Sequence, residues 1–410
     1  MKILLATSKA SLTFGGIATY NYELQKILGR NHQLYLMTDS EEYDIPGYVQ
    51  TISLNGKKKF SYKEARDIVE RINSRHFDLI INSRSSLMPI IAPFVNAPII
   101  SVSHYVNGFQ ADNAGYNSKY QSNIVALSYW GKKYLDKKFS IDDPEKVKVI
   151  YNFVAENTKP FNEEKLNSNC PIIVFPGGTS RHKGFDMVMI AVYKLLKTNL
   201  PFKFYWLGNE TLPVKELSLL RFHRISQFFK NDERVIITGQ IPRDKAEEII
   251  GSANIFLLPS RGEGCPMSLL EAMREGCIPV ISDAKHGSLE LIEKLGCGEI
   301  VKNCSGTSLY YRLKHIIEDI DNYKDCYKKT YDFSRTIVSQ DEWAQQMGSL
   351  ILSCHRDRLV EPISEVKYKQ SSKGYLKLYK RDRRKIQYEG FMIRIKLDFY
   401  YVLNKFHLLF

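Results

Sequence analysis

Ser260-Arg-Gly-Glu-Gly-Cys-Pro-Met-Ser-Leu-Leu-Glu-Ala-Met273 is the most informative stretch of this 410-residue chain. It follows a predicted strand, Ile255–Leu258, and enters a predicted helix, Met267–Glu275. The N-terminus of such a helix presents unpaired backbone N–H groups to an anion, and the Glu263 and Glu271 carboxylates accept hydrogen bonds from hydroxyls. This combination indicates a site for a phosphorylated ligand that carries sugar or ribose hydroxyls. Ordinary surface glutamates are the weaker interpretation, because Glu263 lies among glycines and Glu271 lies on an otherwise apolar helix.

The segments around this stretch alternate between short apolar runs and amphipathic helical patterns. This alternation predicts parallel sheets covered by helices on both faces. We therefore expect an α/β fold with two Rossmann-like domains that face each other across a cleft. The expected strands are Lys2–Thr7, Gln33–Met37, Phe77–Asn82, Pro98–Ser103, Pro171–Phe175, Phe202–Leu207, Val235–Thr238, Ile255–Leu258 and Pro279–Ser282, and the helices between them include Ile17–Leu28, Asp186–Lys197 and Ala246–Ser252.

The length of the chain predicts more than one domain, because single hydrophobic cores stop growing near ~250–300 residues. We expect an N-terminal Rossmann-like domain over residues 1–158 and a C-terminal Rossmann-like domain over residues 168–335. A polar segment that ends at Asn169 links them, and a helix near 341–355 is expected to pack back on the first domain. Residues 361–410 form a basic, aromatic extension.

The positive charge of the chain is concentrated in that extension. The formal net charge is +13, and residues 361–410 contribute 12 Lys/Arg against 5 Asp/Glu together with ten Tyr or Phe. More than half of the surplus therefore lies in the last 50 residues, which argues against a protein that binds nucleic acid over its whole surface. Two interpretations stay open, namely that 361–410 packs on protein or that it adsorbs to an anionic membrane face.

The apolar runs and the cysteines favour a cytoplasmic protein, peripheral at most on the inner face of the membrane. The longest apolar stretch, Leu87–Val95, contains two prolines and is far shorter than the ~20 residues that span a bilayer. The N-terminal run Ile3–Ala6 is shorter than the ~7-residue minimum of a secretory signal. The seven cysteines contain no C-x-x-C pair, so neither a disulfide framework nor a zinc site is expected; they are residues 170, 265, 277, 297, 304, 326 and 354.

Two further loops follow predicted strands and suit an anion. Gly15-Gly16 opens a helix, which lets backbone N–H groups approach a phosphate. Pro176-Gly-Gly-Thr-Ser-Arg-His-Lys-Gly184 combines glycines with Arg181 and Lys183, two cations that suit a diphosphate. Taken alone, the Gly15-Gly16 loop is equally consistent with a plain glycine turn. The loop 176–184 is equally consistent with a solvated basic loop.

Glu263-x7-Glu271, within E-G-C-P-M-S-L-L-E-A-M-R-E-G-C-I-P-V-I-S, resembles the signature of the retaining GT-B glycosyltransferases of family GT4. Further matches extend the resemblance over about residues 1–355. They are Gly15-Gly16, the motif from Ala126 to Leu135, Val149-Ile-Tyr-Asn152, and Phe175-Pro-Gly-Gly with Lys183-Gly184.

The resemblance implies that the domain over 1–158 lies on the acceptor side and that the domain over 168–335 binds the nucleotide sugar. It also implies a role for each matching residue. The donor-binding residues would be Gly15 and Gly16 at the diphosphate, Arg181 and Lys183 as its counter-charges, Glu271 at the ribose, and Gly264 with the N–H groups of Met267 and Ser268 at the sugar. The catalytic residues would be Glu263, which holds the sugar hydroxyls, with His104, Arg181 and Lys183.

The chain departs from the family pattern at two positions. Gly178 stands where the family often has its phosphate-binding Arg, so Arg181 would substitute for it. Pro266 replaces the second glycine of the usual E-G-x-G and removes one backbone donor. The only D-x-D, Asp319-Ile-Asp321, falls in an apparent surface helix. We therefore expect transfer without a metal or other cofactor, and retention by same-face attack as the resemblance implies.

The expected function is transfer of a sugar from a nucleoside-diphosphate sugar to a lipid-linked or oligosaccharide acceptor, in surface polysaccharide or glycolipid biosynthesis. No nucleic-acid partner is expected. A GT-B-fold epimerase or phosphorylase is the alternative enzyme, and a catalytically silent nucleotide-sugar-binding subunit is the alternative of a different class.

Overall fold

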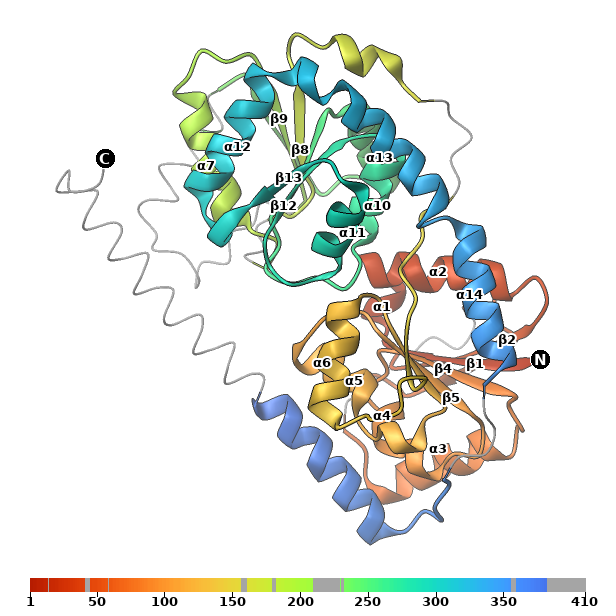
Figure 1. Cartoon of the computed structure of the whole chain (residues 1–410). Helices are drawn as coiled ribbons and strands as arrows, with labels where there is room; N and C mark the ends of the chain where they lie inside the picture. The colour runs from red at the N-terminus through yellow and green to blue at the C-terminus, as the bar shows by residue number, and fades with distance from the viewer. Residues whose placement is uncertain are drawn as a thin grey trace, which may run out of the picture. The chain divides into compact units, whose positions relative to one another are not determined.

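The computed structural model describes residues 1–13, 15–40, 45–57, 59–155, 161–178, 182–208, 229, 232–354 and 359–381 (Figure 1). By its internal contacts the chain divides into two compact units. The first unit comprises Met1–Glu156, Glu263–Met267 and Val338–Lys380, and the second comprises Asn157–Gly262 and Ser268–Ile337. The short segment Glu263–Met267 therefore belongs, by its contacts, to the first unit.

The first unit is built on a seven-stranded parallel sheet with strand order β3-β2-β1-β4-β5-β6-β7. Five of the six residues of β1 are buried, as expected for a strand covered by helices on both faces. The strand order reverses between β1 and β4, and ligands bind at such a switch point beyond the carboxyl ends of the strands. The strands are β1 Lys2–Thr7, β2 Gln33–Thr38, β3 Thr51–Ser53, β4 Leu79–Ser83, β5 Ile99–Ser103, β6 Asn123–Ala126 and β7 Val147–Val149.

Helices cover this sheet, and local sequence determines where several of them start. Ser61 caps α3 in a capping box, because its hydroxyl accepts from Glu64 N and the Glu64 carboxylate accepts from Ser61 N.

Trp343 of α14 is buried against Phe153, with ring centroids 4.6 Å apart. The helices of this unit are α1 Ala10–Thr13, α2 Gly16–Leu28, α3 Tyr62–Asn73, α4 Met88–Ile91, η1 Ala92–Phe94, α5 Gly108–Gly115, η2 Ser118–Tyr120, α6 Tyr129–Phe139 and α14 Gln340–Leu352.

The second unit repeats this design with a six-stranded parallel sheet of order β10-β9-β8-β11-β12-β13. Its strand order reverses between β8 and β11, so the loops after these two strands flank the switch point. The strands are β8 Ile172–Phe175, β9 Lys203–Leu207, β10 Val235–Gly239, β11 Ile255–Leu258, β12 Ile278–Ser282 and β13 Glu299–Val301. The helices are η3 Glu163–Asn167, α7 Phe185–Leu196, α9 Arg243–Ser252, α10 Met267–Arg274, α11 Gly287–Leu295, η4 Lys302–Cys304, α12 Gly306–Glu318, η5 Ile320–Tyr323 and α13 Lys324–Thr336.

The predicted fold class, two Rossmann-like α/β domains, is confirmed by these two sheets. One detail of the sequence interpretation needs correction, since Asp319-Ile-Asp321 does not lie inside a single helix. α12 ends at Glu318 and η5 starts at Ile320, so the D-x-D spans their junction. Its carboxylates are exposed and pair with His315 and Lys324.

A helix over residues 365–381 packs on the first unit. The rings of Tyr368 and Tyr375 are 4% and 5% exposed and join the hydrophobic core of the first unit. Tyr368 Oη donates to Phe60 O at 2.7 Å, and Tyr375 Oη accepts from Asn113 Nδ2 at 2.6 Å. Residues 361–380 of the predicted extension are therefore part of this unit, and residues 382–410 lie outside the described residues.

Polar contacts fix the register of this helix. Tyr116 Oη donates to Ser371 O at 2.8 Å, and Ser371 Oγ donates to Ile90 O at 2.8 Å. Asn117 Nδ2 donates to the same Ser371 Oγ at 3.0 Å. The helix is thus held by specific hydrogen bonds as well as by apolar burial. Nowhere in the part of the chain that the structure describes does a helix combine the length and apolarity needed to cross a membrane.

We predict that Tyr375→Ala releases helix 365–381 and lowers the free energy of unfolding of the first unit by about 3–5 kcal/mol, as for other large-to-small core substitutions. Tyr379→Ala is the matched control, because Tyr379 is 43% exposed and should cost less than about 1 kcal/mol. Chemical denaturation and limited proteolysis at 365–381 measure the difference. Equal effects of the two substitutions would show that the helix is not anchored through Tyr375.

Candidate functional site

The segment between β1 and α2 lies at the switch point of the first unit. It ends at Gly15, and Gly16 is the first residue of α2. Gly15 precedes α2 with φ 81°, a left-handed conformation that favours glycine. A Cβ on Gly16 would lie 3.6 Å from Met267 Cγ. The predicted glycine loop and the start of α10 are therefore in contact, with the backbone of α2 starting beside them.

At Gly264 the backbone of segment 263–267 lies directly against the backbone of His104. A Cβ built on Gly264 would lie 2.3 Å from the carbonyl oxygen of His104, a distance that no real side chain tolerates. Asn152 Nδ2 also donates to the carbonyl oxygen of the neighbouring Cys265. Glu263 and Met267 are 7% and 5% exposed. Segment 263–267 is therefore held tightly, and it brings together four predicted residues, Gly16, His104, Gly264 and Met267.

A chain of hydrogen bonds orients His104. Ser83 Oγ donates to Asn21 Oδ1 at 2.6 Å and lies 2.9 Å from His104 Nε2. Because the single hydroxyl proton of Ser83 goes to Asn21, Nε2 of His104 carries the hydrogen in that contact. Asn21 Nδ2 donates in turn to Thr7 Oγ1 at 3.1 Å. The residues at the ends of β1 and β4 thus select one tautomer of His104 and leave its Nδ1 as an acceptor.

His104 is also kept uncharged. Burial, and secondly the positive charge of Arg84, lower the pKa of His104 from 6.5 to about 3. Arg84 follows β4 with φ 73°, an unusual backbone conformation for a residue with a side chain. The edge of the Tyr20 ring contacts His104, with centroids 5.0 Å apart. A neutral imidazole at this place can position or accept a hydrogen bond, but it does not supply an imidazolium charge.

In the second unit, the loops after β8 and β11 lie side by side. Gly184 has φ 82°, and a Cβ on it would lie 2.2 Å from Pro259 O. Arg261 N donates to His182 O at 2.8 Å, and the Arg261 guanidinium binds the Asp186 carboxylate through two hydrogen bonds of 2.8 and 2.7 Å. These contacts fix the turn that carries Lys183, which is partly exposed. Arg181 lies outside the described residues.

Helix α10 carries the remaining predicted residues, Ser268 and Glu271. The helix begins at Met267, so Pro266 directly precedes it. Glu271 Oε1 lies 3.3 Å from Arg243 Nη2 in an ion pair whose Glu271 side chain is 16% exposed. Arg243 is the first residue of α9. The carboxylate predicted for a ribose is therefore held in the second unit by a cation from a neighbouring helix.

Sequence reasoning missed several residues that support the site. Ser83 and Arg84 directly follow a strand, so attention to every strand end would have found them. Asn21, Arg243 and Arg261 act through contacts between distant segments, which no local pattern reveals. No cluster of three or more His, Cys, Asp or Glu side chains in the described ranges is arranged to hold a metal ion.

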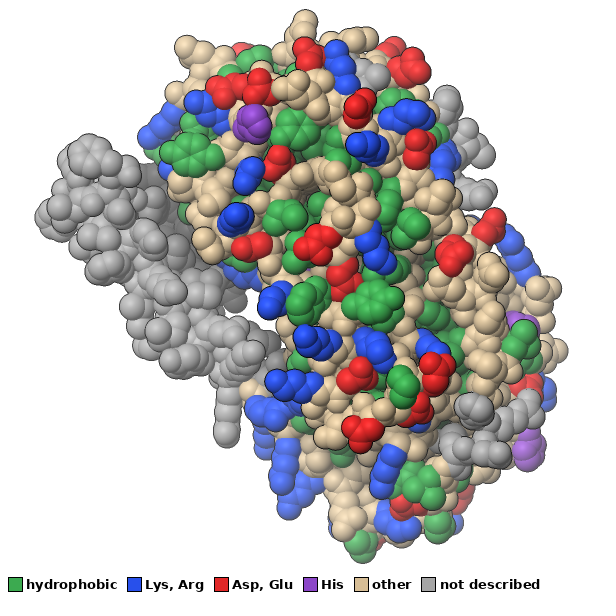
Figure 2. Space-filling model, viewed as in Figure 1, with side chains coloured by type: hydrophobic (Ala, Val, Ile, Leu, Met, Phe, Trp, Pro, Cys, Tyr) green, Lys and Arg blue, Asp and Glu red, His purple; other side chains and the backbone are tan. Residues whose placement is uncertain are grey.

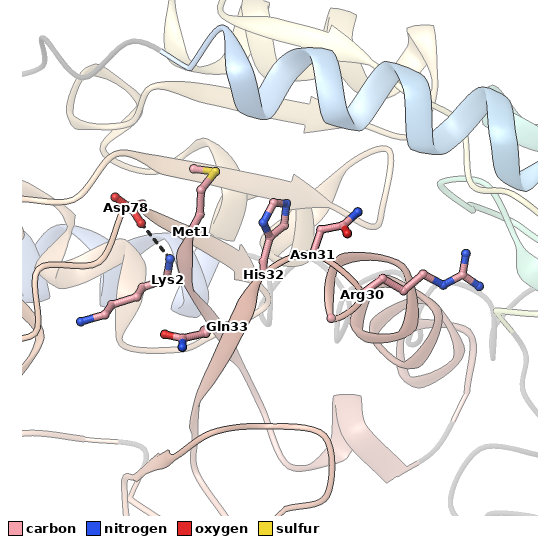
Figure 3. Close-up of a pocket in the computed structure, with 8 residues that line it drawn as sticks. Met1, Lys2, Arg30, Asn31, His32, Gln33 and Asp78 are labelled. Carbon is pink, nitrogen blue, oxygen red and sulfur yellow. Dashed lines mark hydrogen bonds between the residues drawn. The ribbon is translucent and has the colours of Figure 1, made fainter.

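A cavity of about 530 Å³ lies elsewhere in the first unit (Figure 3). Lys2 N donates to Asp78 Oδ2 at 2.8 Å at its rim. The cavity is lined by residues near the starts of β1, β2 and β4. It therefore lies at the amino ends of the strands, opposite to the switch-point loops at their carboxyl ends. The cavity contains none of the predicted site residues; it is lined by Met1, Lys2, Gly29, Arg30, Asn31, His32, Gln33 and Asp78.

Residues 156–333 match the family Glycosyl transferases group 1. A curated relative, glycogen synthase from Thermodesulfovibrio yellowstonii, is 30% identical over 198 residues, which are 45% of this chain and 37% of that protein. The chain thus spans little more than a third of the length of this relative.

Solved glycosyltransferase structures share the fold at low sequence identity. Anabaena Alr3699/HepE in complex with UDP-glucose has a TM-score of 0.68 at 15% identity, over 86% of this chain and all of that chain. WaaG, a glycosyltransferase involved in lipopolysaccharide biosynthesis, has a TM-score of 0.61 at 13% identity, again over 86% of this chain and all of that chain. These neighbours agree with the two parallel sheets described above.

We predict that Gly264→Ala displaces segment 263–267 and costs about 1–3 kcal/mol of stability, because the new methyl group overlaps a backbone carbonyl. Gly262→Ala is the control, since its Cβ would meet His182 Cε1 at an ordinary 3.5 Å. Thermal unfolding of the two variants measures the difference. An equally mild effect of both would contradict the close approach to His104.

We predict that His104 stays neutral down to about pH 3 in the folded chain. In the unfolded chain it takes up its proton near 6.5, so the unfolded state binds more protons between these values. The free energy of unfolding should therefore fall as the pH drops from 6.5 toward 3, and His104→Gln should lack this contribution. Histidine NMR titration checks the pKa; an imidazole that titrates near 6 would contradict it.

Proposed function

We propose that this chain transfers a glycosyl group from a nucleoside-diphosphate sugar to a glycan acceptor, with retention of the anomeric configuration. The observation that carries the proposal is the stretch from Glu263 to Glu271. One end of it is fixed beside Gly16 and His104 in the first unit, and the other end forms α10 in the second. The family match over 156–333 and a neighbour solved with UDP-glucose support a nucleotide-sugar donor.

In this proposal, different residues bind different parts of the donor. Glu271 accepts from the ribose hydroxyls, and Glu263 accepts from the hydroxyls of the transferred sugar. Lys183, together with Arg181, offsets the negative charge that grows on the diphosphate as the sugar leaves. His104 contributes a neutral, fixed imidazole, whose Nδ1 accepts a hydrogen bond from the sugar.

The transfer step needs only the donor, the acceptor and these side chains. The acceptor oxygen bonds to the anomeric carbon on the same face from which the diphosphate departs, and the departing phosphate oxygen takes the acceptor proton. The chemistry of Lys183 and of the backbone N–H groups at α10 suits stabilisation of that phosphate without a metal. We expect turnover to persist in excess EDTA, and an activity abolished by EDTA and restored by manganese would contradict this.

The alternatives make different demands on the same site. An epimerase would convert or hydrolyse the nucleotide sugar without an acceptor, and a phosphorylase would require inorganic phosphate. A silent binding subunit would bind the donor but release no nucleotide under any condition. Product analysis with and without acceptor or phosphate separates the four functions.

We predict that Glu271→Gln mainly weakens donor binding, whereas Glu263→Gln also lowers kcat. A charged hydrogen bond contributes roughly 1.5–3 kcal/mol, so ten- to hundred-fold effects are expected. Glu293→Gln is the matched control, because Glu293 is an exposed residue of α11. Nucleotide release is measured over a panel of donor sugars. Wild-type kinetics in both the Glu263 and Glu271 variants would overturn the assignment.

We propose further that the acceptor is lipid-linked and that helix 365–381 binds an anionic membrane surface. Four lysines recur on this helix at spacings of three and four residues, which places them along one face; they are exposed, and they are Lys369, Lys373, Lys377 and Lys380. Val366 beside them is 67% exposed. Figure 2 shows a row of Lys and Arg side chains at the lower left of the view, where Figure 1 draws helix 365–381. WaaG, which shares the fold, is involved in lipopolysaccharide biosynthesis, and the proposal extends a lipid-bearing acceptor to this chain.

Substitution of these four lysines by glutamine tests the membrane proposal without removing the buried Tyr368 and Tyr375. Each lysine near an anionic surface contributes on the order of 1 kcal/mol, so binding to phosphatidylserine liposomes at low salt should be lost. The matched control removes the same charge from exposed lysines of the second unit, namely Lys294, Lys302, Lys324 and Lys328. Equal binding by both variants and the wild type would contradict the proposal.

A further inference from the structure

The second unit contains two cysteines whose sulfur atoms lie unusually close together. Cys297 Sγ and Cys326 Sγ are 2.6 Å apart, although both are free thiols and 28 residues separate them in the sequence. Because an S–S bond is about 2.05 Å long, the two sulfurs need to move by only about 0.5 Å to bond. The fold therefore places the pair in position for a disulfide.

The surroundings give the two thiols different roles. Cys297 lies in the turn between α11 and β13, between Gly296 and Gly298, which both have positive φ. It is partly exposed, whereas Cys326, the third residue of α13, is 5% exposed. A reagent from solution can reach Cys297, and Cys326 then lies behind it as the resolving thiol.

Hydrogen bonds favour the thiolate of Cys297. The Cys326 thiol donates to Cys297 Sγ, and Thr330 Oγ1 lies 3.7 Å from the same sulfur. The first of these contacts lowers the pKa of Cys297, with smaller contributions from Thr330 and from the positive charge of Lys329, while burial opposes the shift. The hydrogen bond to Cys297 and, secondly, burial raise the pKa of Cys326, as does the negative charge of the neighbouring thiolate. Cys297 is accordingly the nucleophile of the pair.

We propose that Cys297 and Cys326 form a reversible intramolecular disulfide when the chain meets a low-molecular-weight disulfide. The Cys297 thiolate attacks one sulfur of that reagent, forms a mixed disulfide and releases one thiolate. Cys326 then loses its proton and attacks Cys297 Sγ, which forms the protein disulfide and expels the second thiolate. The protein loses two electrons and two protons in total, and the reagent is reduced to two thiols.

The bridge would restrain the second unit rather than block the candidate site. It closes a loop that contains β13, α12 and the start of α13, and such a cross-link stabilises by limiting the unfolded state. Cys297 precedes β13, so it lies at the amino edge of the sheet, whereas the candidate site lies at the carboxyl ends. Oxidation is therefore expected to change stability and leave the loops of the site in place.

The test treats the folded full-length chain with oxidised glutathione, traps remaining thiols with an alkylating reagent under denaturing conditions, and maps the peptides by mass spectrometry. We expect a 297–326 cross-linked peptide that has lost two hydrogen atoms, and a higher midpoint of thermal unfolding. Dithiothreitol should reverse both changes. Cys170→Ser is the control, because Cys170 is exposed and distant in sequence from the pair, and it should behave as the wild type does.

Two variants separate the steps. Cys326→Ser should stop at a mixed disulfide on Cys297, and Cys297→Ser should form neither the mixed disulfide at this pair nor the shift in unfolding. The proposal is overturned if the oxidised wild type keeps both thiols alkylatable. It is equally overturned if Cys297 pairs instead with another cysteine, or if Cys297→Ser shows the same thermal shift as the wild type.

Discussion

The close approach of Gly264 to the carbonyl oxygen of His104 is the constraint on which the candidate site depends. A side chain at residue 264 would overlap that oxygen, so the backbone of segment 263–267 can lie where it does only with glycine there. Glu263 and Met267 on either side are buried as a result. Ser83 and Asn21 fix one imidazole tautomer of His104, the residue whose backbone carbonyl lies against Gly264.

Each unit places its candidate residues at the same point of a parallel sheet, which is where the strand order reverses. In the first unit these residues follow β1, β4 and β5, and in the second they follow β8 and β11. Ion pairs hold the candidate segments of the second unit. Arg261, in the loop after β11, pairs with Asp186 of α7, and Arg243 of α9 pairs with Glu271 of α10. Charges that are already paired cost less to hold in place than free ones, so the loops are organised before any ligand binds.

Periodicity predicted most of the strands within two residues, because buried parallel strands form apolar runs that end in polar loops. The E-x7-E stretch could also be found, since glycines and carboxylates stand together in the sequence. Contacts between distant segments could not be predicted. Three sets of contacts depend on how segments that are distant in the sequence pack together. They are the Ser83–Asn21–His104 hydrogen bonds, the Arg243–Glu271 ion pair and the Cys297–Cys326 contact. The burial of Tyr368 and Tyr375 in the core of the first unit likewise could not be predicted from the local sequence. A segment rich in basic and aromatic residues is as consistent with binding to a membrane as with packing on protein.

Hydrogen–deuterium exchange of the full-length chain, with and without UDP-glucose and related nucleotide sugars, tests the central claim most directly. The claim is that segment 263–267 is held in place within the first unit and that the stretch 263–271 receives the donor. We predict slow exchange of residues 263–267 in the free chain, and added protection of 264–271 and of the turn around Lys183 when a donor binds. Fast exchange of 263–267 in the free chain, or donor-induced protection confined to the cavity around Arg30 and His32, would contradict the account.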